Sequence, residues 1–143
     1  MIRKVLILDD EPEAEAIAHV KHFLRQKPWH YEVFTVTHSR EFFAKLRANQ
    51  YSVSFVMIDL HLGIHETGLQ VLQELRKGDL IRPAIILTIS KDSEDIKDCM
   101  EAGAFDYINK DQTPDLMTLR LEIALRRLQQ MEPPALNDEG SVV

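Results

Sequence analysis

Five polar residues follow four short apolar stretches of the sequence. Asp9 and Asp10 follow the first stretch, Asp59 the second and Thr88 the third, while Lys110 comes shortly after the fourth. Short apolar runs bounded by turn residues indicate buried strands, and an open parallel sheet binds its ligands outside the carboxyl ends of its strands. Three carboxylates, a hydroxyl and an ammonium are therefore expected at one edge of a sheet. The four stretches are residues 5–8, 53–58, 84–87 and 105–108.

Three carboxylates gathered in one place favour a bound divalent cation. Two ionised acids about 4 Å apart repel by roughly 4 kcal/mol at an effective dielectric of about 20, so a cation is needed to neutralise them. Asp9, Asp10 and Asp59 offer oxygen alone, which suits Mg²⁺ or Mn²⁺ better than zinc, and Mg²⁺ sites often hold a phosphate as well. A carboxylate such as that of Asp59 can act as a nucleophile and form an aspartyl phosphate. Lys110 and Thr88 would then contact the other phosphoryl oxygens.

The elements that must position these groups alternate between strands and helices. Apolar residues at helical spacing separate the apolar runs, and one further run, residues 31–37, is rich in β-branched and aromatic side chains. Five units of a strand followed by a helix predict an α/β fold, with a doubly wound sheet of five parallel strands of the flavodoxin-like type. The expected strands are residues 5–8, 31–37, 53–58, 84–87 and 106–109, and the expected helices are residues 13–26, 39–49, 68–77, 94–102 and 114–130.

Several details of the helices are also predicted. Asp10 and Pro12 are interpreted as the cap and the first turn of the first helix, and Ser39 as the cap of the second. Cys99 is expected to pack inside the molecule from the fourth helix. The inner face of the last helix is expected to carry Leu116, Leu119, Ile123, Ala124 and Leu128.

The composition is that of one globular domain. Of the 143 residues, 45% are hydrophobic and 28% are charged, and we expect a single domain over residues 1–130 with a tail or linker over residues 131–143. The net charge of -6 argues against direct binding of nucleic acid, and the arginines of the last helix are interpreted as solvated or partner-facing. No apolar stretch approaches the roughly 20 residues of a membrane span. A single cysteine and the lack of a secretion signal indicate a cytoplasmic location.

The order and spacing of these residues resemble the receiver domain of two-component response regulators, over roughly the first nine-tenths of the chain. The resemblance implies that Asp59 accepts a phosphoryl group from a sensor histidine kinase or a histidine phosphotransfer protein. It implies that Asp10 and Asp59 bind the metal directly and that Asp9 acts through water. The backbone carbonyl of His61 would complete the protein ligands. Such a domain is not an enzyme for other substrates, because it catalyses only its own phosphorylation and dephosphorylation.

The resemblance also implies a conformational switch. Thr88 would move toward the phosphoryl group, and Tyr107 would swing inward into the vacated space. The surface made by the fourth helix, the fifth strand and the last helix would change with them and control a downstream effector protein or domain. Formation of a homodimer on phosphorylation is left open. A ligand shifts such an equilibrium only by its differential affinity for the two states, so the partner must prefer one of them.

The chain departs from the receiver pattern at three places. Asp111 follows Lys110 where receivers usually have a proline, so the ammonium is expected to reach the site past a trans peptide bond. The loop over residues 62–67 is one residue longer than usual. Ile89 replaces the small residue that usually follows the threonine, and its bulk is expected to crowd the route to Asp59.

Two other functions compete with phosphoryl acceptance. A pseudo-receiver would use the same fold as a phosphorylation-independent binding module, although no member of the acidic and basic set is missing. A hydrolase of the haloacid dehalogenase type would need a second aspartate two residues after Asp59, where this chain has His61. A zinc site is disfavoured, because the pairs His19/His22 and His61/His65 lack a third ligand at matching spacing.

Overall fold

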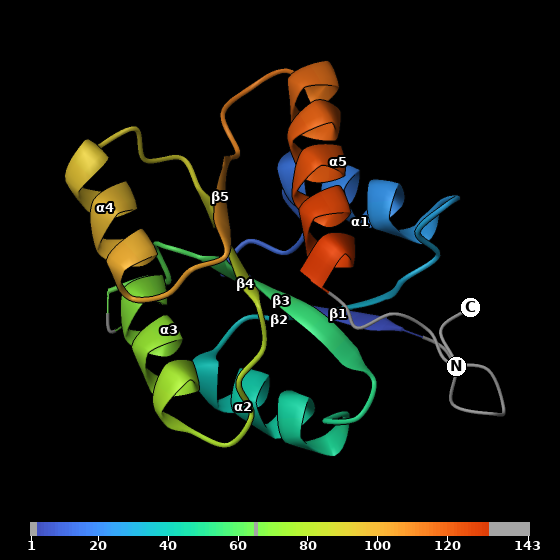
Figure 1. Cartoon of the computed structure of the whole chain (residues 1–143). Coiled ribbons are helices and arrows are strands. Elements are labelled where there is room, and N and C mark those ends of the chain that lie inside the picture. The colour runs from blue at the N-terminus through green and yellow to red at the C-terminus, as the bar shows by residue number, and fades with distance from the viewer. Residues whose placement is uncertain (1–2, 65, 132–143) are drawn as a thin grey trace, which may run out of the picture.

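A five-stranded parallel sheet with the strand order β2-β1-β3-β4-β5 forms the centre of the molecule in the computed structural model (Figure 1). The structure describes residues 3–64 and 66–131, so His65 and the expected tail, apart from Met131, lie outside the described residues. The strand order reverses its direction beside β1, as in a doubly wound sheet, which confirms the predicted fold class. The strands are β1 (Lys4–Leu8), β2 (Glu32–Val36), β3 (Val53–Asp59), β4 (Ala84–Thr88) and β5 (Asp106–Asn109).

Helices cover both faces of this sheet. Helices α1 and α5 lie on one face, and α2, α3 and α4 lie on the other (Figure 1). Strand residues supply the two faces alternately, because successive side chains of a strand point in opposite directions. Val5 and Ile7 thus pack toward α1 and α5, while Leu6 and Leu8 pack toward α2 and α3. The helices are α1 (Glu15–Arg25), α2 (Ser39–Ala48), α3 (Gly68–Lys77), α4 (Ser93–Glu101) and α5 (Pro114–Met131).

The predicted elements are all present, and their ends differ from the expected ones by at most two residues. Cys99 is buried in α4, as expected, and its burial beside acidic neighbours raises the pKa of its thiol to about 11. Among the described residues no helix is both long and apolar enough to cross a bilayer.

Two predicted helix caps are wrong. Helix α1 begins at Glu15 and its N-cap is Ala14, because Asp9 Oδ1 accepts a hydrogen bond from the Glu11 amide and the chain turns once before the helix starts. Ser39 is the first residue of α2 and not its cap, which is His38. The Ser39 hydroxyl donates instead to Glu66, in the segment between β3 and α3.

The predicted inner face of α5 is also partly wrong. Ala124 and Leu128 are buried as expected, but Leu116, Leu119 and Ile123 are 51%, 52% and 41% exposed. The helix is apolar on two sides, and the side that packs on α1 and the sheet consists of Met117, Leu121, Ala124, Leu125 and Leu128. The other side is left at the surface as an apolar stripe.

Gly68, the first residue of α3, packs directly on the backbone of Asp59. A Cβ atom at this position would lie 2.2 Å from the Asp59 carbonyl oxygen and 2.8 Å from Leu60 Cα. The Gly68 amide also donates to the Leu60 carbonyl at 2.8 Å, so neither backbone can move away without losing this bond. The end of β3 is therefore held against the start of α3 by a contact that tolerates no side chain.

We expect Gly68→Ala to lower the free energy of unfolding by about 1–3 kcal/mol, as overpacking against rigid atoms does. Alanine favours a helix more than glycine, so the loss would come from the steric contact and not from helix propensity. Urea denaturation measures the change. Gly78→Ala is the matched control, because its Cβ would meet nothing closer than 3.8 Å, and equal stabilities of the two variants would contradict the prediction.

Candidate functional site

The carboxyl ends of β1 and β3 bring three carboxylates together. One oxygen of each of Asp9, Asp10 and Asp59 lies within 4.8 Å of the others. Asp9 is fully buried and Asp59 is 3% exposed, whereas Asp10 is at the surface. The structure thus places the three acids as the strand ends predicted, with Asp10 on the solvent side of the cluster.

Lys110 approaches the same cluster from the end of β5. Its Nζ donates to Asp9 Oδ2 at 2.9 Å and lies 3.4 Å from Asp59 Oδ2, with 12% of the side chain exposed. The cis peptide bond of the described residues is Lys27–Pro28, so the Lys110–Asp111 bond is trans, as expected. The ammonium reaches both buried acids without the proline that usually follows it in receivers.

The donor set fits a hard divalent cation. Three carboxylates face one ammonium, so the cluster keeps an excess of negative charge when all the groups are ionised. Its side chains offer oxygen ligands alone, which Mg²⁺ and Mn²⁺ prefer, and Asp10 lies on the side open to solvent. Among the described residues, Asp9, Asp10 and Asp59 form the one group of three or more acidic, histidine or cysteine side chains whose ligand atoms lie close enough together to hold a metal ion.

Burial governs the ionisation of Asp59. Loss of hydration raises the pKa of its carboxyl from 3.8 to about 7, Lys110 opposes this rise, and Asp9 adds to it. Burial lowers the pKa of the Lys110 ammonium, but its hydrogen bond to Asp9 and the charges of both acids together raise it. Lys110 therefore stays charged, whereas the raised pKa of Asp59 brings the titration of its carboxyl near neutral pH.

Thr88 lies at the end of the strand next to that of Asp59, and Tyr107 lies one strand further along the sheet. Thr88, at the end of β4, is buried, and its Oγ1 accepts a hydrogen bond from the Ser90 amide at 3.0 Å. Tyr107, on β5, is half-buried against the core on the side of α2–α4. The structure thus places Thr88 on the strand adjoining that of Asp59 and Tyr107 on the edge strand beyond it, while their role in a switch stays a prediction.

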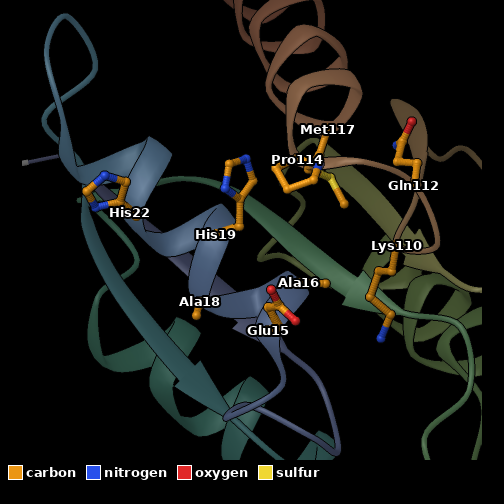
Figure 2. A pocket seen from close by; sticks show the side chains of 9 residues that line it. All are labelled: Glu15, Ala16, Ala18, His19, His22, Lys110, Gln112, Pro114 and Met117. Atoms are coloured by element: carbon orange, nitrogen blue, oxygen red, sulfur yellow. The ribbon is translucent and has the colours of Figure 1, made fainter.

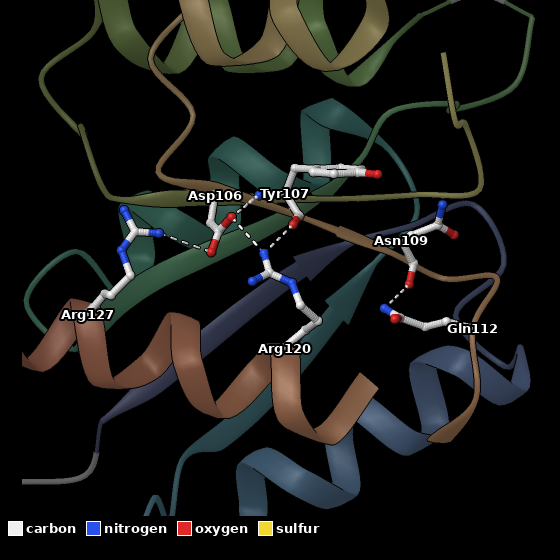
Figure 3. A network of polar contacts seen from close by, with 6 residues as sticks. All are labelled: Asp106, Tyr107, Asn109, Gln112, Arg120 and Arg127. Atoms are coloured by element: carbon white, nitrogen blue, oxygen red, sulfur yellow. Dashed lines mark hydrogen bonds and ion pairs between the residues drawn. The ribbon is translucent and has the colours of Figure 1, made fainter. Parts of the chain in front are cut away.

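A buried acid on β5 was not anticipated from the sequence. Asp106 is 8% exposed and forms ion pairs with Arg120 at 3.1 Å and Arg127 at 3.2 Å, both from α5 (Figure 3). Arg120 also donates to the Tyr107 carbonyl at 3.2 Å, and Arg127 lies over the Phe105 ring. Arg120 and Arg127 thus pair with an acid, while 37% and 51% of their side chains remain exposed, so the prediction of a solvated or partner-facing edge is not contradicted. Their spacing of two helical turns on one face was the signal available in the sequence.

A hollow of about 590 Å³ lies beside the site, between α1 and the start of α5 (Figure 2). Lys110 and Gln112 form one of its walls, and His19 and His22 of α1 form another. His19 Nε2 is 2.9 Å from Thr118 Oγ1, so this histidine bridges α1 and α5. The hollow gives the acidic edge an adjoining concave surface.

A doubly wound sheet with three acids and a lysine at its carboxyl edge is the arrangement of receiver domains. The family model for the response regulator receiver domain matches residues 5–122, and the chain belongs to this family. It is therefore a receiver domain of the kind found in response regulators of two-component signalling.

Individual relatives agree with this family. The chain is 32% identical over 142 residues to the transcriptional regulatory protein KdpE of Mycobacterium tuberculosis, a match that covers 97% of this chain and 59% of KdpE. It thus spans about three-fifths of the length of this curated relative. A response regulator receiver domain protein from Clostridium thermocellum has a solved structure with a TM-score of 0.71, 26% identity, and 92% and 100% coverage of the two chains. The phosphorylated cyanobacterial phytochrome response regulator RcpA shares the fold, with a TM-score of 0.77, 21% identity, and 93% and 98% coverage.

The raised pKa of Asp59 predicts a pH-dependent effect of its removal in the metal-free protein. The folded state favours the protonated carboxyl, so the stability that Asp59 contributes is present below its ordinary pKa of 3.8 and is lost as the pH rises through about 7. Asp59→Asn, which keeps a neutral side chain at all pH values, should gain stability over the wild type by on the order of 2–4 kcal/mol between pH 4 and pH 8. Urea denaturation in the presence of a chelator measures the difference. Asp79→Asn, at an exposed acid outside the site, is the control, and a gain that does not grow with pH would contradict the prediction.

Proposed function

We propose that this receiver takes a phosphoryl group onto Asp59 in a Mg²⁺-dependent reaction. The observation that supports this most is the nearly buried Asp59 carboxylate, with an ammonium 3.4 Å away and two further acids within 4.8 Å. A structural ion pair would need one acid for one lysine. The surplus of carboxylates is costly without a cation, and a phosphoryl group needs such a cation at its oxygens.

Each residue has a separate role in the proposed reaction. Asp10, Asp59 and the carbonyl of His61 would hold the cation, and the buried Asp9 would orient Lys110 through their 2.9 Å hydrogen bond. When bound, a divalent cation neutralises charge on the phosphoryl oxygens and favours the ionised form of Asp59. Lys110 supplies a point charge to a second phosphoryl oxygen.

The proposed reaction forms one bond to phosphorus and breaks another. A carboxylate oxygen of Asp59 attacks the phosphorus, and the bond from phosphorus to the donor atom breaks. The bonding electrons leave with the donor, which is the imidazole of a phosphohistidine or the acetate of acetyl phosphate. The hydroxyl of Thr88, whose oxygen accepts from the Ser90 amide, still has its own hydrogen to donate to a phosphoryl oxygen.

The proposed output is a change of the surface made by α4, β5 and α5. Movement of Thr88 would leave space for the half-buried Tyr107 ring. The backbone of Tyr107 is held in place by Arg120, which donates to its carbonyl. The same face carries the exposed apolar side chains of Leu116 and Leu119. We propose that a downstream effector protein or domain, or a second copy of the chain, recognises this surface in one of its two states.

The proposed phosphoryl donor is a histidine kinase or a histidine phosphotransfer protein acting in the cytoplasm. The hollow between α1 and α5 lies next to Lys110 and would accept part of such a partner (Figure 2). The expectation that the protein avoids nucleic acid finds no support, because relatives such as KdpE are transcriptional regulatory proteins. The phosphorylation-independent alternative is not favoured, since the acids, the threonine and the lysine are all in place.

Intact mass spectrometry after incubation with Mg²⁺ and acetyl phosphate tests the proposal. We expect the addition of one phosphoryl group, its loss when Mg²⁺ is chelated, and no addition to Asp59→Asn. A histidine phosphotransfer donor should be tried alongside the small donor, because Ile89 is expected to hinder small molecules. A folded protein that gains no phosphoryl group from either donor would contradict the proposed function.

Ile89 is expected to lengthen the life of the phosphoryl group. The structure places this residue just after Thr88, with 63% of it exposed, at the solvent side of the site. A bulky apolar side chain near the phosphoryl group hinders the approach of water, and exclusion of water slows hydrolysis. Ile89→Ala should therefore accept phosphoryl groups from small donors faster and lose them several-fold faster than the wild type, as followed by mass spectrometry over time. Equal lifetimes would show that the side chain does not control access.

A further inference from the structure

Helix α2 begins against a carboxylate from another part of the chain. Its N-cap, His38, makes no side-chain cap, but Glu66 accepts two hydrogen bonds from Ser39, one from the backbone N at 3.1 Å and one from Oγ at 2.6 Å. The first N–H groups of a helix lack acceptors within the helix, and the helix dipole favours an anion at this end. A two-point, charge-assisted contact of this kind is stronger than a single neutral hydrogen bond.

Glu66 belongs to the connection between β3 and α3, which also carries His61. This connection is closed at its base by an isolated antiparallel bridge between His61 and Thr67. The His61 amide in turn donates to Asp59 Oδ1 at 3.2 Å. The base of the connection is therefore closed on itself, and Glu66, the residue next to Thr67, ties this base to a separate element, α2, through Ser39.

The connection between β2 and α2 also contacts the end of β1, where Asp9 and Asp10 lie. Strand β2 ends at Val36, whose carbonyl accepts a hydrogen bond from the Asp9 amide at 3.0 Å. Helix α2 starts three residues later, at Ser39. The connection between β2 and α2 thus contacts the strand end that carries Asp9 and, through Glu66, the connection that carries His61.

We propose that Glu66 is a positioning residue of the cation site. Its contact with Ser39 would fix the His61 carbonyl relative to Asp9 and Asp10. This inference rests on the proposed function, because the cation concerned is the one assigned there. Glu66 would not be a ligand itself, since Ser39 engages both of its carboxylate oxygens.

The test is the affinity of the full chain for Mn²⁺, measured by the electron paramagnetic resonance signal of the free ion and without any phosphoryl donor. Glu66→Ala should weaken binding roughly tenfold, as the loss of an orienting contact behind a metal ligand does. Glu66→Gln keeps one carbonyl acceptor and should fall between this variant and the wild type. In the metal-free protein, the His61 amide should exchange its hydrogen faster in Glu66→Ala than in the wild type.

Asn49→Ala separates positioning from simple stabilisation of α2. Asn49 lies at the other end of this helix, where its Nδ2 donates to the Lys45 carbonyl at 2.9 Å and its Oδ1 accepts from Lys4 at 2.8 Å. Its removal weakens α2 without touching the connection that carries His61. We expect this variant to bind Mn²⁺ like the wild type and to leave the exchange of the His61 amide unchanged.

Two outcomes would overturn the inference, and they differ from each other. If the wild type binds Mn²⁺ and Glu66→Ala binds it equally well, or no more weakly than Asn49→Ala, then Glu66 has no positioning role. If the wild type itself binds no Mn²⁺, the proposed function fails and this inference fails with it. The wild-type titration alone distinguishes the two cases.

Discussion

The contact of one ammonium with two buried carboxylates is the interaction on which the site depends. Lys110 Nζ lies 2.9 Å from Asp9 and 3.4 Å from Asp59. The two acids lie at the ends of β1 and β3, which are separate in the sequence and adjacent in the sheet. Unpaired buried charges are costly, so removing the ammonium would leave both acids uncompensated. One ammonium nevertheless cannot neutralise three acids. The remaining negative charge is the feature that fits the cation and the phosphoryl group proposed for this edge of the sheet.

Close backbone packing holds the acids in place. Gly68 allows the start of α3 to touch the end of β3, and the hydrogen bond from Asp9 to Val36 joins the end of β1 to that of β2. These contacts connect neighbouring elements, whereas the contact of Glu66 with Ser39 reaches across to α2. The geometry of the site is thus a property of several connections that meet at one edge, and not of the strands alone.

Helix α5 shows where the sequence pattern was insufficient. Its apolar residues cover two sides, so their periodicity alone could not determine which side faces the core. The tertiary structure decides this through packing against α1 and through the pairing of two α5 arginines with the buried Asp106 (Figure 3). The apolar side left exposed lies on the surface that would carry the output. The apolar residues that the sequence misplaced are therefore exposed at the surface.

The sequence by itself determined the five alternating units and the strand ends at which the acids, Thr88 and Lys110 lie, because short apolar runs and turn residues are local signals. It also determined that the expected ligands are oxygen atoms. Only the tertiary structure decided the pKa of Asp59, the pairing of Asp106, the exposed side of α5 and the link of Glu66 to α2. Each of these depends on burial or on contacts between distant segments, and such contacts exist only after the chain has folded.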